Sequence, residues 1–122
     1  MSWQEEFNDK RLAKGGWYGC IVQDGWKELV LETDAMLLRM DPDYKICQVK
    51  EKFGTLRYYY DSELEYGTIE RKIMDAIINA AEAKSAGICE WCGKYGELRT
   101  RRYYVLTLCD GCDKDRDKEV GK

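Results

Sequence analysis

Four cysteines between residues 89 and 112 are the residues of this chain whose type and spacing point most directly to chemistry. They form two Cys-x-x-Cys pairs, Cys89 with Cys92 and Cys109 with Cys112, and sixteen residues separate the pairs. Two residues between paired cysteines allow a tight turn that aims both thiolates at one point, which is typical of structural four-thiolate zinc sites. A connection of sixteen residues is long enough for two short antiparallel strands that return the second pair to the first.

All four ligands of such a site would be cysteine, because the chain contains no histidine. A zinc ion bound by four thiolates has no open coordination position, so we expect structural rather than catalytic Zn²⁺. Two alternatives stay open: a mononuclear iron site of the rubredoxin type, and thiols that are unliganded or form redox disulfides. Gly93, directly after the first pair, can take the positive φ angle that such a turn often needs. Asp113 stands in the equivalent place after the second pair and tolerates that conformation less well.

Enzymatic chemistry finds little support elsewhere in the sequence. Without histidine, Ser-His and Cys-His nucleophilic arrangements are excluded. Acidic pairs such as Glu63 with Glu65 have the character of solvated turns, and the chain has no glycine-rich phosphate loop. Cys20 and Cys47 fall outside the paired pattern, and we expect both as small buried apolar residues. We therefore predict a protein without enzymatic activity.

The elements that must position the cysteines begin with a helix. Apolar residues recur at helical spacing and predict a helix over residues 25–40. Asp24 is a good N-cap for this helix, and Pro42 ends it because proline restrains the residue before it. Upstream, a short helix could carry Trp3 and Phe7 on one side.

The next segment alternates in the manner of a β-hairpin. Residues 44–60 hold two runs rich in β-branched and aromatic residues on either side of a turn-like segment, Glu51 to Gly54. Thr68 then caps a second helix over residues 68–85. The residues that share one face of this helix are Ile69, Ile73, Ala76, Ile77, Ala80 and Lys84. Because Gly87 ends the helix just before the first cysteine pair, we expect it to lead directly into the metal site.

Together these elements predict an α+β fold with two helices, a β-hairpin and a C-terminal four-cysteine zinc ribbon. Residues 1–87 would form a small α/β region, and residues 88–122 a zinc ribbon with a charged tail, the two packed as one unit. The chain has 122 residues. A chain of this size buries only a modest core, so the metal would compensate for the small size.

The charge balance speaks against a basic nucleic-acid-binding domain. The formal net charge is −3, with 9 basic and 13 acidic side chains in the first 66 residues and 11 basic and 10 acidic side chains in the remainder. No apolar run approaches membrane length, and the first residues lack a basic-then-apolar leader. We therefore predict a cytoplasmic protein without membrane contact, in a compartment where Cys-x-x-Cys pairs stay reduced and bind metal.

Two mixed patches of cationic and aromatic residues could contact a partner. Between the cysteine pairs, Arg99, Arg101 and Arg102 precede Tyr103 and Tyr104. These side chains could stack on bases and pair with phosphates, pair with acidic groups of a protein, or simply solvate the ribbon. The second patch, on the hairpin, has the same ambiguity and comprises Lys50, Lys52, Phe53, Arg57 and the three residues Tyr58 to Tyr60.

Three runs carry a resemblance to a known family: QVKEKFGTLRYYYD, then AAEAKSAGICEWCG, then ELR followed by TLCDGC. They resemble a family of small, mostly uncharacterised proteins from phages, prophages and bacteria, whose pattern is a VKEKFG-x-LR-aromatic hairpin, a helix and a Cys-x-x-Cys ribbon. The resemblance covers residues 44–112. Many relatives have a histidine in the second knuckle, where this chain has Cys109 and Cys112.

Small phage zinc proteins of this group are similar to known anti-CRISPR proteins directed at type II-A Cas9. The resemblance implies stoichiometric inhibition in the host bacterial cytoplasm, in which the protein binds Cas9 and prevents target DNA from loading or being cut. An acidic protein suits that role, because Cas9 holds nucleic acid in a positively charged channel. Interface propensity alone singles out Tyr58, Tyr59, Arg101 and Tyr103 as contact residues.

Two further hypotheses come from other classes of protein. The alternative is a zinc-ribbon nucleic-acid-binding regulatory protein, which would use the arginine and tyrosine residues of the ribbon. With few cations against an acidic total, its binding should be weak and salt-sensitive. The third hypothesis is a structural phage accessory protein that associates with itself.

Overall fold

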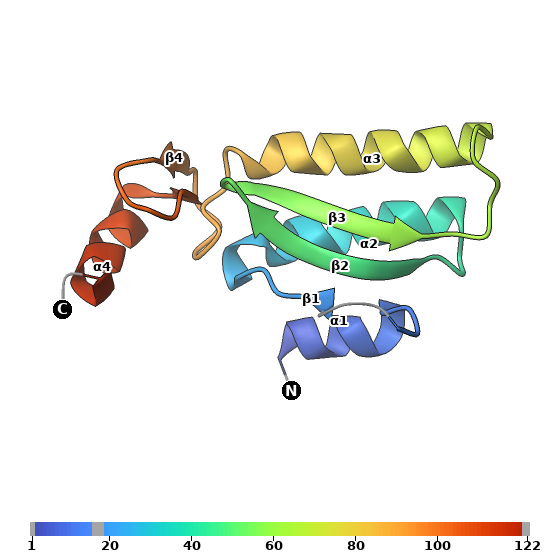
Figure 1. Ribbon diagram of the computed structural model, residues 1–122, viewed down its shortest axis with the longest axis horizontal. Coiled ribbons are helices and arrows are strands. Elements are labelled where there is room, and N and C mark those ends of the chain that lie inside the picture. The colour runs from blue at the N-terminus through green and yellow to red at the C-terminus, as the bar shows by residue number, and fades with distance from the viewer. Residues whose placement is uncertain (1, 16–18, 121–122) are drawn as a thin grey trace.

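A small sheet backed by helices, with a separate cysteine ribbon at one end, makes up the molecule (Figure 1). The computed structural model describes residues 2–15 and 19–120, and of residues 117–120 it describes the backbone alone. The α+β class predicted from the sequence, with a C-terminal cysteine cluster, is confirmed. None of the described helices is long and apolar enough to cross a lipid bilayer.

The sheet contains three strands in the order β1-β2-β3. β1 (Gly19–Cys20) runs parallel to β2 (Lys45–Lys52), and β2 pairs antiparallel with β3 (Thr55–Asp61), which confirms the predicted hairpin. Phe53 and Gly54 form the hairpin turn with φ angles of 52° and 82°. Two successive positive φ angles match the twist of a two-residue hairpin turn, and glycine at the second position takes that conformation without strain.

The helix predicted over residues 25–40 is confirmed except in its first turn. A 3₁₀ turn (Asp24–Trp26) leads into α2 (Lys27–Met40). The prediction that Asp24 caps this helix was wrong, because Trp26 occupies the N-cap position and makes no side-chain capping bond. The Asp24 carboxylate instead accepts a hydrogen bond of 2.9 Å from Trp3 Nε1. The tighter turn brings the backbone of Gly25 against the cysteine ribbon, where its N–H donates to the Glu90 carbonyl.

The second predicted helix, α3 (Ile69–Ser85), begins where expected, with Thr68 Oγ1 accepting a hydrogen bond from the Arg71 backbone N–H. The face on which it packs differs from the apolar face found in the sequence. Its buried residues are Arg71, Met74, Ala81 and Ser85. Arg71 can lie on the buried face because its guanidinium stacks between the rings of Tyr60 and Tyr66, 4.9 Å and 4.2 Å from their centroids.

The hydrophobic core lies between the sheet and the pair formed by α2 and α3, which lie side by side (Figure 1). Its largest fully buried side chains are those of Trp26, Tyr44, Leu37, Ile46, Leu56 and Met74. α1 (Trp3–Arg11) lies along β1, and a capping box between Ser2 and Glu5 fixes its first turn. The predicted short N-terminal helix is therefore present.

One polar network crosses this core and joins three elements and a loop residue. Arg11 Nε donates to Asp34 Oδ1 at 2.7 Å, and the Tyr44 hydroxyl donates to the same carboxylate. The Tyr44 and Tyr58 hydroxyls are 2.6 Å apart. Because each buried polar group here has a partner, the network links α1, α2 and β3 through Tyr44, the residue before β2, without leaving an unpaired charge.

The ribbon follows α3 and has its own two-stranded sheet. β4 (Glu97–Arg99) pairs antiparallel with β5 (Leu106–Leu108), as predicted for the connection between the cysteine pairs. The charged tail forms a helix, α4 (Asp110–Val120), whose first turn contains the last cysteine. We call residues 2–87 the body of the molecule and residues 88–120 the ribbon.

Candidate metal centre

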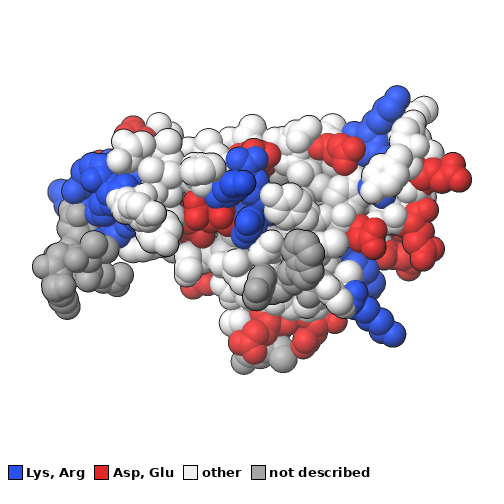
Figure 2. Space-filling model, viewed as in Figure 1, with Lys and Arg blue, Asp and Glu red and all other residues white. Residues whose placement is uncertain are grey.

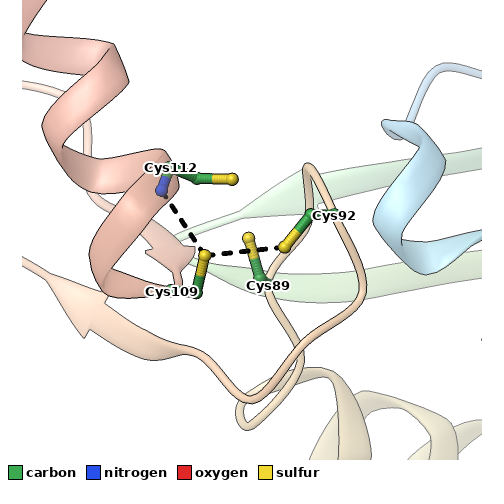
Figure 3. Close-up of side chains that lie close together, drawn as sticks. All are labelled: Cys89, Cys92, Cys109 and Cys112. Atoms are coloured by element: carbon green, nitrogen blue, oxygen red, sulfur yellow. Dashed lines mark hydrogen bonds between the residues drawn. The ribbon is translucent and has the colours of Figure 1, made fainter.

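The four cysteines predicted as metal ligands come together at one point (Figure 3). Their Sγ atoms all lie within 4.8 Å of one another, and those of Cys92 and Cys109 are 3.5 Å apart. With Zn–S bonds of about 2.3 Å, tetrahedral geometry places the sulfurs about 3.8 Å apart. All six cysteines of the chain are free thiols. The donor set therefore fits a four-coordinate metal ion, although it does not by itself choose between zinc and iron.

The first knuckle is a loop that turns back on itself directly after α3. The Cys89 backbone N–H donates to the Lys94 carbonyl at 2.7 Å, and the Gly93 N–H donates to the Cys89 carbonyl at 2.9 Å. Gly93 takes a φ angle of 84°, which confirms the role expected for this glycine. The turn leaves Cys89 fully buried and Cys92 at the surface.

The second knuckle lies at the start of a helix, whereas the first lies in a loop. Cys109 lies immediately before α4, and its Sγ accepts a hydrogen bond of 3.4 Å from the Cys112 backbone N–H. Asp113 is helical, so this knuckle needs no residue with a positive φ angle. The N-terminus of a helix also favours negative charge, which suits thiolate ligands.

Hydrogen bonding lowers the pKa of one of these two thiols, and burial raises the pKa of the other. The N–H of Cys112 lowers the pKa of Cys109 to about 7. Burial, followed by the neighbouring thiols, raises the pKa of Cys112 well above its ordinary value. Four thiols this close cannot all ionise unless a cation offsets their charge, so metal binding must release protons.

Three arginines of the ribbon surround the second knuckle. Arg102 Nη1 and Arg101 Nη2 donate to the two carboxylate oxygens of Asp113 at 2.5 Å and 3.1 Å, and Arg99 Nη2 donates to Asp110 at 2.8 Å. Burial alone would raise the pKa of Asp113, but these bonds outweigh it and keep that pKa below its ordinary value. The arginines therefore brace the start of α4, a role that their spacing in the sequence did not reveal.

The body and the ribbon meet along a tight backbone contact. The Gly25 N–H donates to the Glu90 carbonyl at 2.7 Å, and Thr107 Oγ1 donates to the Gly54 carbonyl at 2.6 Å. A Cβ atom on Gly25 would lie 2.1 Å from the Cys89 carbonyl oxygen, so only glycine fits there. The 3₁₀ turn before α2 and the hairpin tip thus hold the first knuckle from two sides.

Sequence reasoning missed Glu90, a buried carboxyl beside the first cysteine. Its side chain is 4% exposed and accepts a hydrogen bond of 3.2 Å from the Gln23 backbone N–H. Burial raises its pKa to about 7, against the opposing effect of that hydrogen bond. No signal in the sequence marks this residue, because it is one of the two residues between Cys89 and Cys92 and its partner lies 67 positions away.

Three of the four predicted contact residues lie at the surface. Tyr103 is 94% exposed, Tyr59 is 47% exposed, and the Arg101 side chain is 56% exposed. Tyr58 is 4% exposed and hydrogen-bonded to Tyr44, so its proposal as a contact residue was wrong. Its partner on β2 is Val49, and both side chains point into the core.

The structure also joins the two patches that the sequence presented separately. A cleft of about 370 Å³ lies between the hairpin tip and the ribbon, and its lining residues are Glu51, Lys52, Phe53, Tyr103, Tyr104 and Val105. Lys52 Nζ lies 5.8 Å from the centroid of the Phe53 ring, and the Tyr103 and Tyr104 rings contact edge to face. We call these residues the aromatic cleft.

Cys20 and Cys47 lie in the sheet, away from the cluster. Cys20 is buried as expected, and burial raises its pKa to about 11. Cys47 is only partly buried. No protein-family model, curated protein or solved structure matches this chain.

Proposed function

We propose that this is a non-enzymatic binding protein whose four cysteines hold a structural zinc ion. The observation that carries the proposal is the convergence of four thiol sulfurs, two from the loop after α3 and two from the start of α4. A centre with four protein ligands leaves no coordination position for a substrate or water. Its effect would be to hold the ribbon against the body, and so to keep the two sides of the aromatic cleft together.

Metal analysis tests the first part of the proposal. We expect about one zinc per chain by elemental mass spectrometry, and in Co²⁺-loaded protein the intense charge-transfer bands of thiolate ligation. Cys92→Ser should lower the metal content, whereas Cys47→Ser, outside the cluster, should leave it unchanged. One iron per chain together with a red colour would show that the bound metal is iron and not zinc. Chains that take up no metal would contradict the proposal.

For the partner, we propose direct binding to Cas9 of type II-A, based on the resemblance over residues 44–112. Acidic side chains, with some basic ones among them, gather at the end of the body remote from the ribbon (Figure 2) and support this. The exposed acidic residues just before β2 and at or after the end of β3 are Asp43, Asp61, Glu63 and Glu65. An acidic surface complements a channel that binds nucleic acid.

Cleavage of a matched DNA target by Cas9 is the test, with the protein added before or after the DNA. We expect inhibition near one equivalent only when the protein is added first. The double variant Glu63→Lys/Glu65→Lys should weaken inhibition more than the single control Glu6→Lys does. Undiminished cleavage by several type II-A enzymes would overturn the Cas9 proposal and leave the metal centre untouched.

A second candidate, single-stranded nucleic acid, is favoured by the aromatic cleft. Exposed aromatic rings beside cations can stack on bases and pair with phosphates. Fluorescence anisotropy with labelled single-stranded DNA and RNA should then show binding that falls steeply with salt. Tyr103→Ala should weaken it, whereas Tyr95→Ala, an exposed ribbon tyrosine outside the cleft, should not. Binding that does not respond to Tyr103→Ala would exclude the cleft as the site.

A further inference from the structure

The outer side of α3 carries an apolar stripe that the core does not use. Ile69 and Ile73 are 71% and 41% exposed. Ala76, Ala80 and Ala83 continue the stripe and are exposed as well. In Figure 1, α3 forms the upper boundary of the molecule, and Figure 2 shows that the surface along this boundary is mostly uncharged. The stripe shares Ile69, Ile73, Ala76 and Ala80 with the helix face found in the sequence, and it points to solvent.

The spacing of the stripe is that of a helix-pairing seam. The five residues follow one another at intervals of four, three, four and three, which is the alternation of the core positions in a heptad repeat. Lys72 and Asn79 border the stripe on one side, and Glu70, Ile77 and Lys84 border it on the other. Within the described residues nothing covers this seam, so it is open to a second molecule.

The side chains along the stripe change in size from one end to the other. The two isoleucines lie in its N-terminal half, and the three alanines lie in its middle and C-terminal part. We propose that α3 packs antiparallel against α3 of a second copy of this chain. In that arrangement Ile73 of one copy faces Ala80 of the other and Ile69 faces Ala83, so that large side chains fill the space above small ones along the whole contact.

Charge at the border selects the same orientation. Glu70 and Lys84 lie on the same side of the stripe, with Ile77 midway between them, at heptad spacing. An antiparallel pair centred near Ile77 sets Glu70 of each copy against Lys84 of the other. A parallel pair would set glutamate against glutamate and lysine against lysine, which costs energy. Both the sizes and the charges therefore favour a two-fold symmetric dimer.

Sedimentation equilibrium of the full, metal-loaded chain over a range of concentrations is the first test. We expect a reversible change from the mass of one chain to that of two. Ala80→Glu, which places charge in the centre of the seam, should leave a monomer with unchanged metal content and circular dichroism. A wild-type chain that stays monomeric at millimolar concentration would overturn the proposal.

A charge-swap cycle tests the orientation. Glu70→Lys and Lys84→Glu should each raise the dissociation constant of the dimer by roughly tenfold, because each creates two like-charge contacts. The double swap Glu70→Lys/Lys84→Glu should restore the wild-type value. Glu6→Lys is the matched control, since Glu6 is likewise an exposed acidic residue in the first turn of a helix, α1, and should have no effect. A double swap no better than either single swap would overturn the antiparallel pairing.

Discussion

The body and the ribbon are stabilised by different means, although they form one continuous chain. Among the described residues, the buried hydrophobic cluster runs from Phe7 to Ala81. Of the ribbon's described residues, Cys89 and Leu108 alone count among the buried hydrophobic residues. The pairing of β4 with β5, ion pairs, backbone contacts with the body and the four thiols hold the rest of the ribbon. A segment with so little apolar surface to bury cannot offset its loss of chain entropy, so its fold should depend on the metal.

Removing the metal should therefore produce the largest difference in stability between the ribbon and the body. Chelation, or Cys89→Ser, is expected to lower the free energy of unfolding of the ribbon by several kcal/mol, while the body keeps its own melting transition. Amide NMR spectra with and without chelator would show dispersed body signals and collapsed ribbon signals. Unchanged melting and unchanged spectra would contradict the dependence on metal.

A change within the polar network should do the reverse, lowering the stability of the body and leaving the metal centre unaffected. Asp34→Ala leaves the Arg11 guanidinium and the Tyr44 hydroxyl without their common acceptor. We expect a loss of about 3 kcal/mol in the free energy of unfolding of the body, measured by chemical denaturation, with unchanged metal affinity. Tyr58→Phe, which removes a single hydroxyl, should cost about 1 kcal/mol. A comparable loss of metal affinity in Asp34→Ala would show that the two regions are not independent.

The contact between the regions can be tested at Gly25. Gly25→Ala forces a Cβ atom against the Cys89 carbonyl, and we expect a loss of about 2 kcal/mol in stability together with weaker metal binding. Gly111→Ala is the matched control, because its Cβ would meet open space and alanine favours the helix. Competition with a chromophoric chelator would measure the metal affinity of both variants. Equal affinities in the two variants would contradict a role for this contact.

The smallest expected effect concerns pH, which should act on the two regions in opposite directions. Burial raises the pKa of Cys20 to about 11, so above pH 9 the unfolded chain loses this proton before the folded chain does. The body should therefore lose about 1 kcal/mol between pH 8 and pH 10 through this group, and Cys20→Ala should remove that part of the slope. The metal centre should instead weaken on acidification, because its thiolates are then protonated. Denaturant unfolding between pH 8 and pH 10 and metal titrations at lower pH would measure the two effects.

Local patterns in the sequence were sufficient for much of the fold and for the cluster of four cysteines. Helical spacing and Thr68 placed α3, alternation placed the hairpin, and the cysteine spacing identified all four thiols that converge. Each of these features depends on residues close together in the chain, or on a spacing whose chemistry is specific.

The features that could not be predicted depend on distant partners. Arg71 lies on the buried face of α3 because two tyrosines stack on it, so an apolar pattern alone selected the opposite face. Three consecutive tyrosines do not show which of them points inward, because the register with β2 decides it and that register shifts between Ile46 and Gln48. Asp24 does not cap α2 because it begins the 3₁₀ turn that precedes this helix, and this turn places the Gly25 backbone against Glu90, 65 positions further along the chain.

The hairpin tip and the ribbon meet across a long stretch of chain. Thr107 reaches the Gly54 carbonyl over 53 positions, and the Gly25 contact spans a still longer interval. During synthesis the body leaves the ribosome first, so both surfaces that receive the ribbon are in place before Cys109 and Cys112 emerge. The order of the chain would thus let a metal ion be bound after the surfaces that hold the ribbon have formed.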